Sequence, residues 1–198
     1  MITLVIALVL VTLILQDPDG ELGDSLDAAG WRSVIEDARD IDLILGKHWT
    51  IDGNTLIGDS GNEQGGLATF GRQDWRDYEL DFYVTMITGA NASCFIRRTA
   101  DGKKFYACNT LAARKVFRVI LLDNTQQDPF HDLSVVKFDF EEGPEYHMRI
   151  VAHGNSISTY VDGEVVNNVS DDTLLAGHAA FALWYNRMRI REPRYRLL

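Results

Sequence analysis

Two acidic residues have the spacing that paired-carboxylate chemistry needs. Glu79 and Asp81 alternate with apolar residues, so on a β-strand their carboxyl groups would point to the same side. Two carboxyl groups roughly 5–10 Å apart, one on each side of a bond, can hydrolyse a glycosidic linkage. The same alternation is more often that of the solvated face of an amphipathic strand, and we favour this interpretation. Glu141 and Glu142 precede Gly143, a pattern that indicates surface charge in a turn.

Aromatic and planar polar side chains indicate a second kind of chemistry, the binding of sugar rings. Aromatic faces cover the apolar sides of such a ring, and amide or guanidinium groups pair with its hydroxyls. Alternation directs Phe181, Leu183 and Tyr185 inward and leaves Trp184 on the outer face. The side chains predicted to form a binding platform opposite the core are Tyr83, Phe95, Arg97, Asn109 and Trp184. The alternative is that a loop or the N-terminal region covers them.

Motifs for a metal or a cofactor are missing from the sequence. The five histidines lack the spacing of a metal site, and no clustered run of Asp and Asn offers the oxygen ligands of calcium. There is no P-loop, dinucleotide fingerprint or nucleophile elbow. We therefore expect no cofactor and no metal. His131 lies in residues 129–132, which we expect to be a loop at the edge of the fold, where loops often contact ligands.

The two cysteines are predicted to lie opposite each other. Cys94 and Cys108 flank a hairpin signal at Asp101-Gly102, and opposed positions in a hairpin have Cβ atoms roughly 4.5–5.5 Å apart. A disulfide could therefore form in an oxidising compartment. The other reading is a pair of buried free thiols, which we favour because cysteine is among the most buried residue types.

From Trp49 onward the hydrophobic pattern has a period of two. The clearest stretch is DYELDFYVTM at residues 77–86, and about a dozen such short runs are separated by turn signals. This pattern predicts an all-β protein with few or no helices, an antiparallel β-sandwich of the jelly-roll type.

The N-terminal region differs from the rest. Residues 1–15 are apolar apart from two threonines, which is short for a membrane span and suits the apolar part of a secretory signal. We predict a signal peptide or N-terminal membrane anchor at 1–16, an acidic linker at 17–30 and the β-sandwich at 31–198. The expected location is secreted, periplasmic or cell-surface, with membrane attachment through residues 1–16 if that segment is retained.

The net charge of −10 and the pI of about 4.8 restrict the partners. An acidic surface repels phosphate backbones, which argues against nucleic acid, and it also repels anionic polysaccharides. Among glycans, oligosaccharides or polysaccharides without charge are therefore favoured. The alternative, which we favour as the general explanation of such a surface charge, is that it serves solubility alone.

Most of the chain after Trp49 resembles a known superfamily. The similar stretches are WTIDGNTLIG, WRDYELDFYV, NASCFIRR, GKKFYACN, EYHMRIVAHGNSISTYVDGEVV and GHAAFALWYNRMRIREPRYRLL. They resemble the concanavalin A-like lectin/glucanase superfamily, and within it most closely the laminin-G-like domains and the 3-keto-disaccharide hydrolase domain. The resemblance implies a concanavalin A-like sandwich, and it places Asn91 and Arg97 at matching family positions. Calcium is common in this superfamily.

The sequence departs from the hydrolase-like members at three positions. Ala107 stands where they have Glu, Asn109 where they have Gln, and Ser93 where they have Gly. The loss of that carboxylate removes an acid or base. We therefore expect an extracytoplasmic, non-catalytic, carbohydrate-binding or glycan-associated module. The alternatives are a glycosidase-like enzyme acting on 3-keto-glycosides, with Arg97 as a substrate clamp, and a laminin-G-like adhesion or structural domain.

Overall fold

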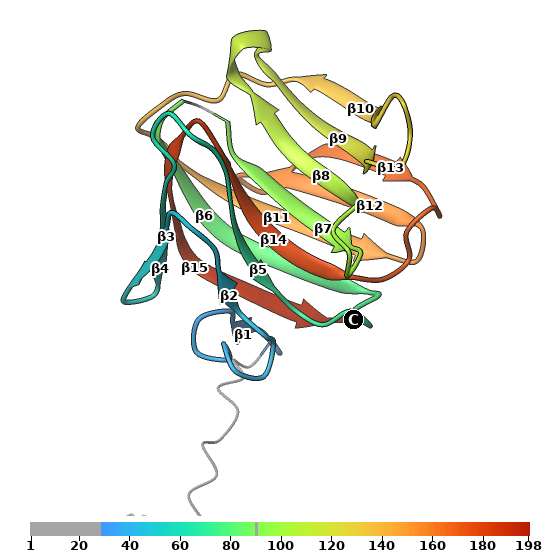
Figure 1. Cartoon of the computed structure of the whole chain (residues 1–198), viewed down its shortest axis with the longest axis horizontal. Coiled ribbons are helices and arrows are strands. Elements are labelled where there is room, and N and C mark those ends of the chain that lie inside the picture. Colours follow the sequence, from blue (N-terminus) through green and yellow to red (C-terminus); the bar gives the residue numbers. More distant parts are fainter. Residues whose placement is uncertain (1–28, 90) are drawn as a thin grey trace, which may run out of the picture.

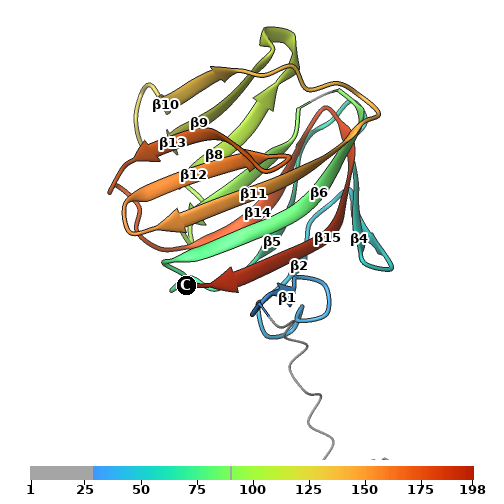
Figure 2. The ribbon, with the colours of Figure 1, turned by 180° about the vertical axis from the view of Figure 1, so that it is seen from behind.

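The computed structural model describes residues 29–89 and 91–198, and it is a sandwich of two antiparallel β-sheets (Figures 1 and 2). The prediction of an all-β antiparallel sandwich is confirmed, since the described residues hold only one short helical turn, η1 (Ala112–Arg114). The predicted segment 1–16 and most of the predicted linker 17–30 lie outside the described residues.

The first sheet, here called sheet A, is seen from its outer side in Figure 2. Its strands are, in spatial order, β13 (Glu164–Ser170), β12 (Ser156–Val161), β11 (Glu145–His153), β6 (Tyr78–Thr88), β15 (Arg187–Leu197), β4 (Thr55–Asp59) and β3 (Trp49–Asp52), with β1 (Arg32–Ser33) paired to β15.

The second sheet, sheet B, faces the viewer in Figure 1. Its strands are, in spatial order, β10 (Phe130–Lys137), β9 (Val116–Asp123), β8 (Lys104–Leu111), β7 (Ser93–Arg98), β14 (His178–Trp184), β5 (Gln64–Phe70) and β2 (Ile44–Leu45).

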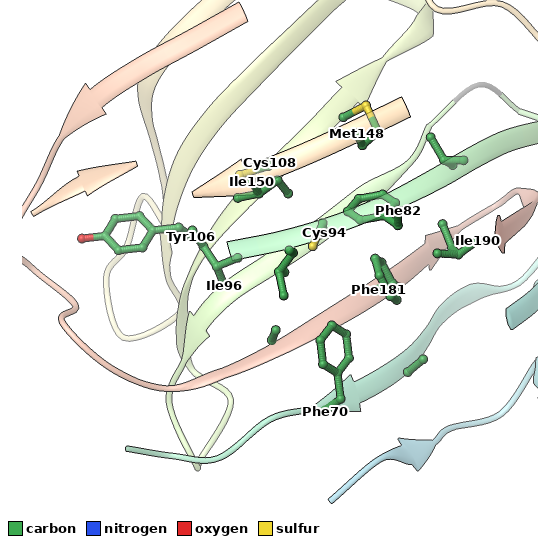
Figure 3. Close-up of a cluster of buried hydrophobic side chains, with 14 of the residues drawn as sticks. Phe70, Phe82, Cys94, Ile96, Tyr106, Cys108, Met148, Ile150, Phe181 and Ile190 are labelled. Atoms are coloured by element: carbon green, nitrogen blue, oxygen red, sulfur yellow. The ribbon is translucent and has the colours of Figure 1, made fainter. Parts of the chain in front are cut away.

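The period-two pattern forms the core as expected. Along β6, Leu80, Phe82 and Val84 are buried between the sheets, while the residues that alternate with them face outward. Figure 3 shows Phe82 of sheet A beside Phe181 of sheet B, and their rings meet edge to face with centroids 4.9 Å apart. Burial of such rings is the main favourable contribution to the stability of a two-layer fold.

The cysteine hairpin forms as predicted. Cys94 of β7 pairs directly with Cys108 of β8, and both side chains lie in the core between the sheets (Figure 3). Both cysteines are free thiols in the structure. Burial raises the pKa of Cys108 to about 12, and burial raises the pKa of Cys94 well above its usual value.

The N-terminal described residues extend the edges of the sandwich. β1 adds to β15 of sheet A, and β2 adds to β5 of sheet B. Figure 1 shows residues 29–48 beside these strands and away from β7, β8 and β9. The described part of the N-terminal region therefore does not cover the central strands of sheet B.

Candidate functional site

The outer face of sheet B carries small side chains at its centre. Alternation directs Ser93 of β7 outward, and its register partners are Asn109 of β8 on one side and Ala182 of β14 on the other. The neighbouring row places Phe95 between Ala107 and Ala180 in the same way. We call the outward side chains of these three strands the platform: Ser93, Phe95, Phe105, Ala107, Asn109, Ala180, Ala182 and Trp184.

Aromatic rings bound the platform on two sides. Phe95 and Phe105 stack with their centroids 4.2 Å apart and an angle of 27° between the rings. With Ala107 and Ile120 they form a hydrophobic cluster that is separate from the core between the sheets. Trp184 ends β14 and is 54% exposed, so it faces outward as predicted.

A line of polar side chains crosses β8, β9 and β10 beside the small side chains of the platform. The Nε of Arg118 in β9 donates to Oδ1 of Asn109 over 2.9 Å, and its Nη1 donates to Oδ1 of Asp132 in β10 over 3.2 Å. The Arg118 side chain is only 16% exposed, so its orientation is held by both partners. We call Asn109, Arg118 and Asp132 the polar line. Arg118 was missed from the sequence, although alternation within KVFRVILLD would have placed it outward.

The backbone around Trp184 is fixed by a buried amide. The side chain of Asn186 accepts from the N–H of Trp184 over 2.7 Å, and its own N–H donates to the carbonyl of Asn91. Tyr185 was predicted to point inward, and this is wrong. Its φ of 53° turns the chain at the end of β14, and the side chain is 47% exposed, edge-on to Trp184.

Arg97 was predicted on the platform, but the structure buries it completely. Its Nε and Nη2 donate to the carbonyl of Arg76, and its Nη1 donates to the carbonyl of Leu174 over 3.1 Å. The register between β7 and β14 shifts by one residue here, and Arg97 has a φ of 50°. This bulge turns the side chain out of the alternation and away from any ligand on the face.

Tyr83 and His131 are also separated from the platform. Tyr83 faces outward as predicted, but from β6 in sheet A, where it stacks on His147 and lies under the guanidinium of Arg191. His131 is exposed and lies within β10 rather than in a loop. Because it pairs with the inward-facing Leu121, it points away from the side of the strand that carries Asp132. Of the six predicted ligand-binding residues, the structure therefore brings together Phe95, Asn109 and Trp184.

The predicted carboxylate pair lies on the outer face of sheet A, where cations hold it. Glu79 is 2.6 Å from Arg149 and 2.7 Å from Arg196. Both carboxyl groups point to the same side as predicted, but they are buried beneath these cations rather than solvated.

Asp81 is also held by two basic side chains, but one of them is a histidine. Its Oδ1 accepts from Nη2 of Arg194 over 2.7 Å, and its Oδ2 is 2.8 Å from Nε2 of His147. The carboxylate therefore fixes the orientation of an imidazole that is about one third exposed.

In the part of the chain that the structure describes, no group of three or more His, Cys, Asp or Glu side chains could hold a metal ion. Across the same residues, no helix has the length and apolarity needed to cross a membrane.

Comparisons with known proteins agree with this architecture. Residues 19–194 match the model of the 3-keto-alpha-glucoside-1,2-lyase-like domain. The chain is similar to carbohydrate binding module CBM66 from Bacillus subtilis, with 16% identity over 76% of this chain and 91% of that one, at a TM-score of 0.66. It is also similar to the exoplasmic/lumenal domain of VIP36 in its calcium- and mannose-bound form, with 8% identity over 78% and 82% of the two chains, at a TM-score of 0.61.

Galectin LEC-6 from Caenorhabditis elegans is a further structural relative, with 10% identity over 74% of this chain and 99% of that one, at a TM-score of 0.55. At these identities the likeness shows the fold. No curated protein sequence matches the chain.

Proposed function

The chain belongs to the family of 3-keto-alpha-glucoside-1,2-lyase-like domains, and from this premise we propose that it is a carbohydrate-binding module that holds neutral glycans on the platform of sheet B. One observation carries the proposal. An exposed indole, Trp184, and a polar line anchored by Arg118 flank a floor of small side chains. This combination provides ring stacking and hydroxyl pairing on one surface.

The spacing of these groups suits a sugar unit. Asn109 and Trp184 lie on strands two steps apart, which separates them by about 10 Å across the sheet. Ser93 and Ala182 continue the row of Asn109 across β7 and β14, and Trp184 lies two residues farther along β14. Neither Ser93 nor Ala182 projects far from the backbone. A ring can therefore approach the sheet here, with the indole on one side and the amide of Asn109 on the other.

The absence of a suitable base supports a non-catalytic role on this face. The strands β7, β8 and β14 contain no Asp or Glu, and Ala107 occupies the position where hydrolase-like relatives have Glu. The carboxylate of the polar line, Asp132, is engaged by Arg118. Acid–base catalysis needs a group free to exchange a proton, and an ion-paired carboxylate at the sheet edge is poorly suited to that task.

Two further considerations support the proposal and its setting. Structures with this fold include a carbohydrate binding module and the exoplasmic/lumenal domain of VIP36 in a calcium- and mannose-bound form. The apolar residues 1–15 favour a location outside the cytoplasm, and glycans are abundant there.

The test is binding of neutral oligosaccharides, measured by glycan array and then by titration calorimetry. Trp184→Ala and Asn109→Ala should each weaken binding about tenfold or more, since each removes a stacking surface or a hydrogen-bonding amide. Tyr185→Ala is the matched control, because Tyr185 is exposed beside Trp184 but lies beyond the end of β14. Absence of binding to every neutral glycan, or equal loss in the control, would overturn the proposal.

A second candidate function is the lyase activity that the family name describes, at His147 on the outer face of sheet A. The observation that favours it is the contact between His147 Nε2 and Asp81 Oδ2, because a carboxylate that holds one imidazole nitrogen leaves the other free as a base. A ketone at C3 of a glucoside acidifies the proton on C2. Its removal forms the C1–C2 double bond as the C1–O bond breaks, and the departing oxygen takes up a proton.

This second candidate is tested by incubating the purified protein with a 3-keto-glucoside and following release of the leaving group. His147→Gln should abolish release while His153→Gln, an exposed histidine at the end of the same strand, leaves it unchanged. No release by the unaltered protein would remove this candidate and leave the binding proposal intact.

A further inference from the structure

An apolar row continues from the platform to the edge of sheet B. The register pairs Phe130 of β10 with Leu122 of β9, and Leu122 with Phe105 of β8. Phe95 of β7 stacks on Phe105 and extends the row to a fourth strand. Four neighbouring strands therefore each contribute a large apolar side chain to one stretch of the outer face.

The row is partly covered by its own members and partly bare. Phe105 and Ile120 are buried, Leu122 and Phe95 are half-buried, and Phe130 at the edge is 55% exposed. An exposed phenyl ring that adjoins a formed apolar cluster can bury further area if a ligand covers it, and such burial is favourable.

The row and the polar line lie on the same strands. On β9, Arg118 is four residues from Leu122, and on β8, Asn109 is four residues from Phe105. Four residues of a strand span about 13 Å, and their side chains point to the same side. On β10 the interval is shorter, because Asp132 is two residues from Phe130. The outer face of sheet B therefore changes from polar to apolar within roughly the length of a small glycoside.

We propose that the ligand is a glycoside with an aryl aglycone. Its sugar units lie along the polar line from Asn109 to Asp132, and its aromatic ring lies on Phe130, two residues from Asp132 on β10. The proposal rests on glycan binding at the platform. A bare oligosaccharide would leave the exposed phenyl ring unused, and an apolar molecule without a sugar would leave the amide and guanidinium of the polar line without hydroxyls to bind. An amphiphilic glycoside matches both halves of the face.

The test compares methyl and phenyl glycosides of glucose, galactose and mannose by titration calorimetry, with phenol as the sugar-free probe. For at least one sugar, the phenyl glycoside should bind about tenfold or more tightly than the methyl glycoside. Phe130→Ala should remove that advantage while leaving the methyl glycoside affinity unchanged. Val165→Ala is the control, because Val165 is an apolar side chain of the edge strand β13, 59% exposed, on the other sheet.

The possible outcomes distinguish a failure of the aglycone proposal from a failure of glycan binding at the platform. If the methyl and phenyl glycosides bind equally, or the phenyl advantage survives in Phe130→Ala, the aglycone proposal is overturned and glycan binding stands. If phenol binds as tightly as the phenyl glycoside, the sugar adds nothing to that affinity and the aglycone proposal is overturned. If no glycoside binds, glycan binding at the platform fails and the aglycone proposal fails with it.

Discussion

The bulge at Arg97 converts a predicted ligand-binding residue into an internal support. Three of its N–H groups are satisfied by two carbonyls, and its Nη2 is 3.7 Å from Oδ1 of Asp77. The carbonyls of Arg76 and Leu174 belong to segments outside β7, so this guanidinium ties the segment before β6 and the segment before β14 to the end of the hairpin. A buried charge held in this way contributes to structure rather than to recognition.

We predict that Arg97→Ala lowers the free energy of unfolding by about 3 kcal/mol, because it leaves buried carbonyls without donors and opens a cavity. Urea denaturation followed by tryptophan fluorescence measures this difference. Arg72→Ala is the control, since that side chain is 61% exposed and its removal should change stability by no more than about 0.5 kcal/mol. Equal effects of the two substitutions would show that Arg97 does not have the supporting role assigned to it.

The two thiols lead to a chemical prediction. A thiolate is the reactive form, and burial keeps Cys94 and Cys108 protonated at neutral pH. The native protein should therefore resist iodoacetamide at pH 8, whereas both residues should react once the protein is unfolded in guanidinium. The alternative is a disulfide between Cys94 and Cys108, and the mass of the intact protein measured without reductant tests it. A disulfide lowers this mass by two hydrogen atoms and blocks alkylation even after unfolding.

At the scale of single elements, local patterns predicted strands well and their partners poorly. Alternation gave the correct inner and outer sides of β6 and the opposed positions of Cys94 and Cys108. It could not show which of two layers a strand joins, and so Tyr83 was grouped with Phe95 although they lie on opposite faces of the molecule.

Contacts between residues far apart in the sequence could not be predicted either. Arg194 reaches Asp81 across 113 positions of the chain, and nothing in either local sequence encodes that contact. The bulge at Arg97 was missed for a related reason, since a positive φ at a residue other than glycine has no local signature.

The turn between β9 and β10 is fixed by one carboxylate. Asp123 accepts from the N–H and the hydroxyl of Thr125, and it is 2.9 Å from Nζ of Lys104. The Thr125 hydroxyl and the Lys104 ammonium hold the pKa of Asp123 well below its usual value. The folded state therefore favours the ionised form of this side chain more than the unfolded state does.

Because the folded pKa is lowered, the stabilisation by Asp123 is complete above the unfolded pKa of about 4 and is lost as the pH falls toward the folded value. We predict that Asp123→Asn is less stable than the unaltered protein by a constant amount between pH 9 and pH 5, and that the gap narrows below about pH 4. Chemical denaturation of both proteins at a series of pH values measures this difference in the free energy of unfolding. Asp128→Asn, in the same turn and exposed, is the control and should change the free energy of unfolding by no more than about 0.5 kcal/mol.

At the scale of the whole molecule, charge is distributed unevenly between the two faces. The chain has a net charge of −10, yet β15 directs five arginines toward the outer side of sheet A, where most pair with carboxylates such as Glu79, Asp81 and Glu145. The platform of sheet B holds no acidic residue, and Arg118 beside it is already paired with Asp132. The site proposed for glycans is therefore close to neutral, while the protein around it is acidic.

This distribution predicts how binding responds to salt. A neutral oligosaccharide held by stacking and hydrogen bonds should change its affinity by less than about twofold between roughly 50 and 500 mM sodium chloride, because no net charge is neutralised on binding. A uronic acid polymer of similar length should bind more weakly at low salt and recover as salt screens its repulsion from the acidic chain. Calorimetric titration across that salt range shows which of the two sheets binds the glycan. If the acidic polymer binds most tightly at low salt and the neutral ligand does not bind, the arginines of β15 rather than the platform would be the surface that recognises glycans.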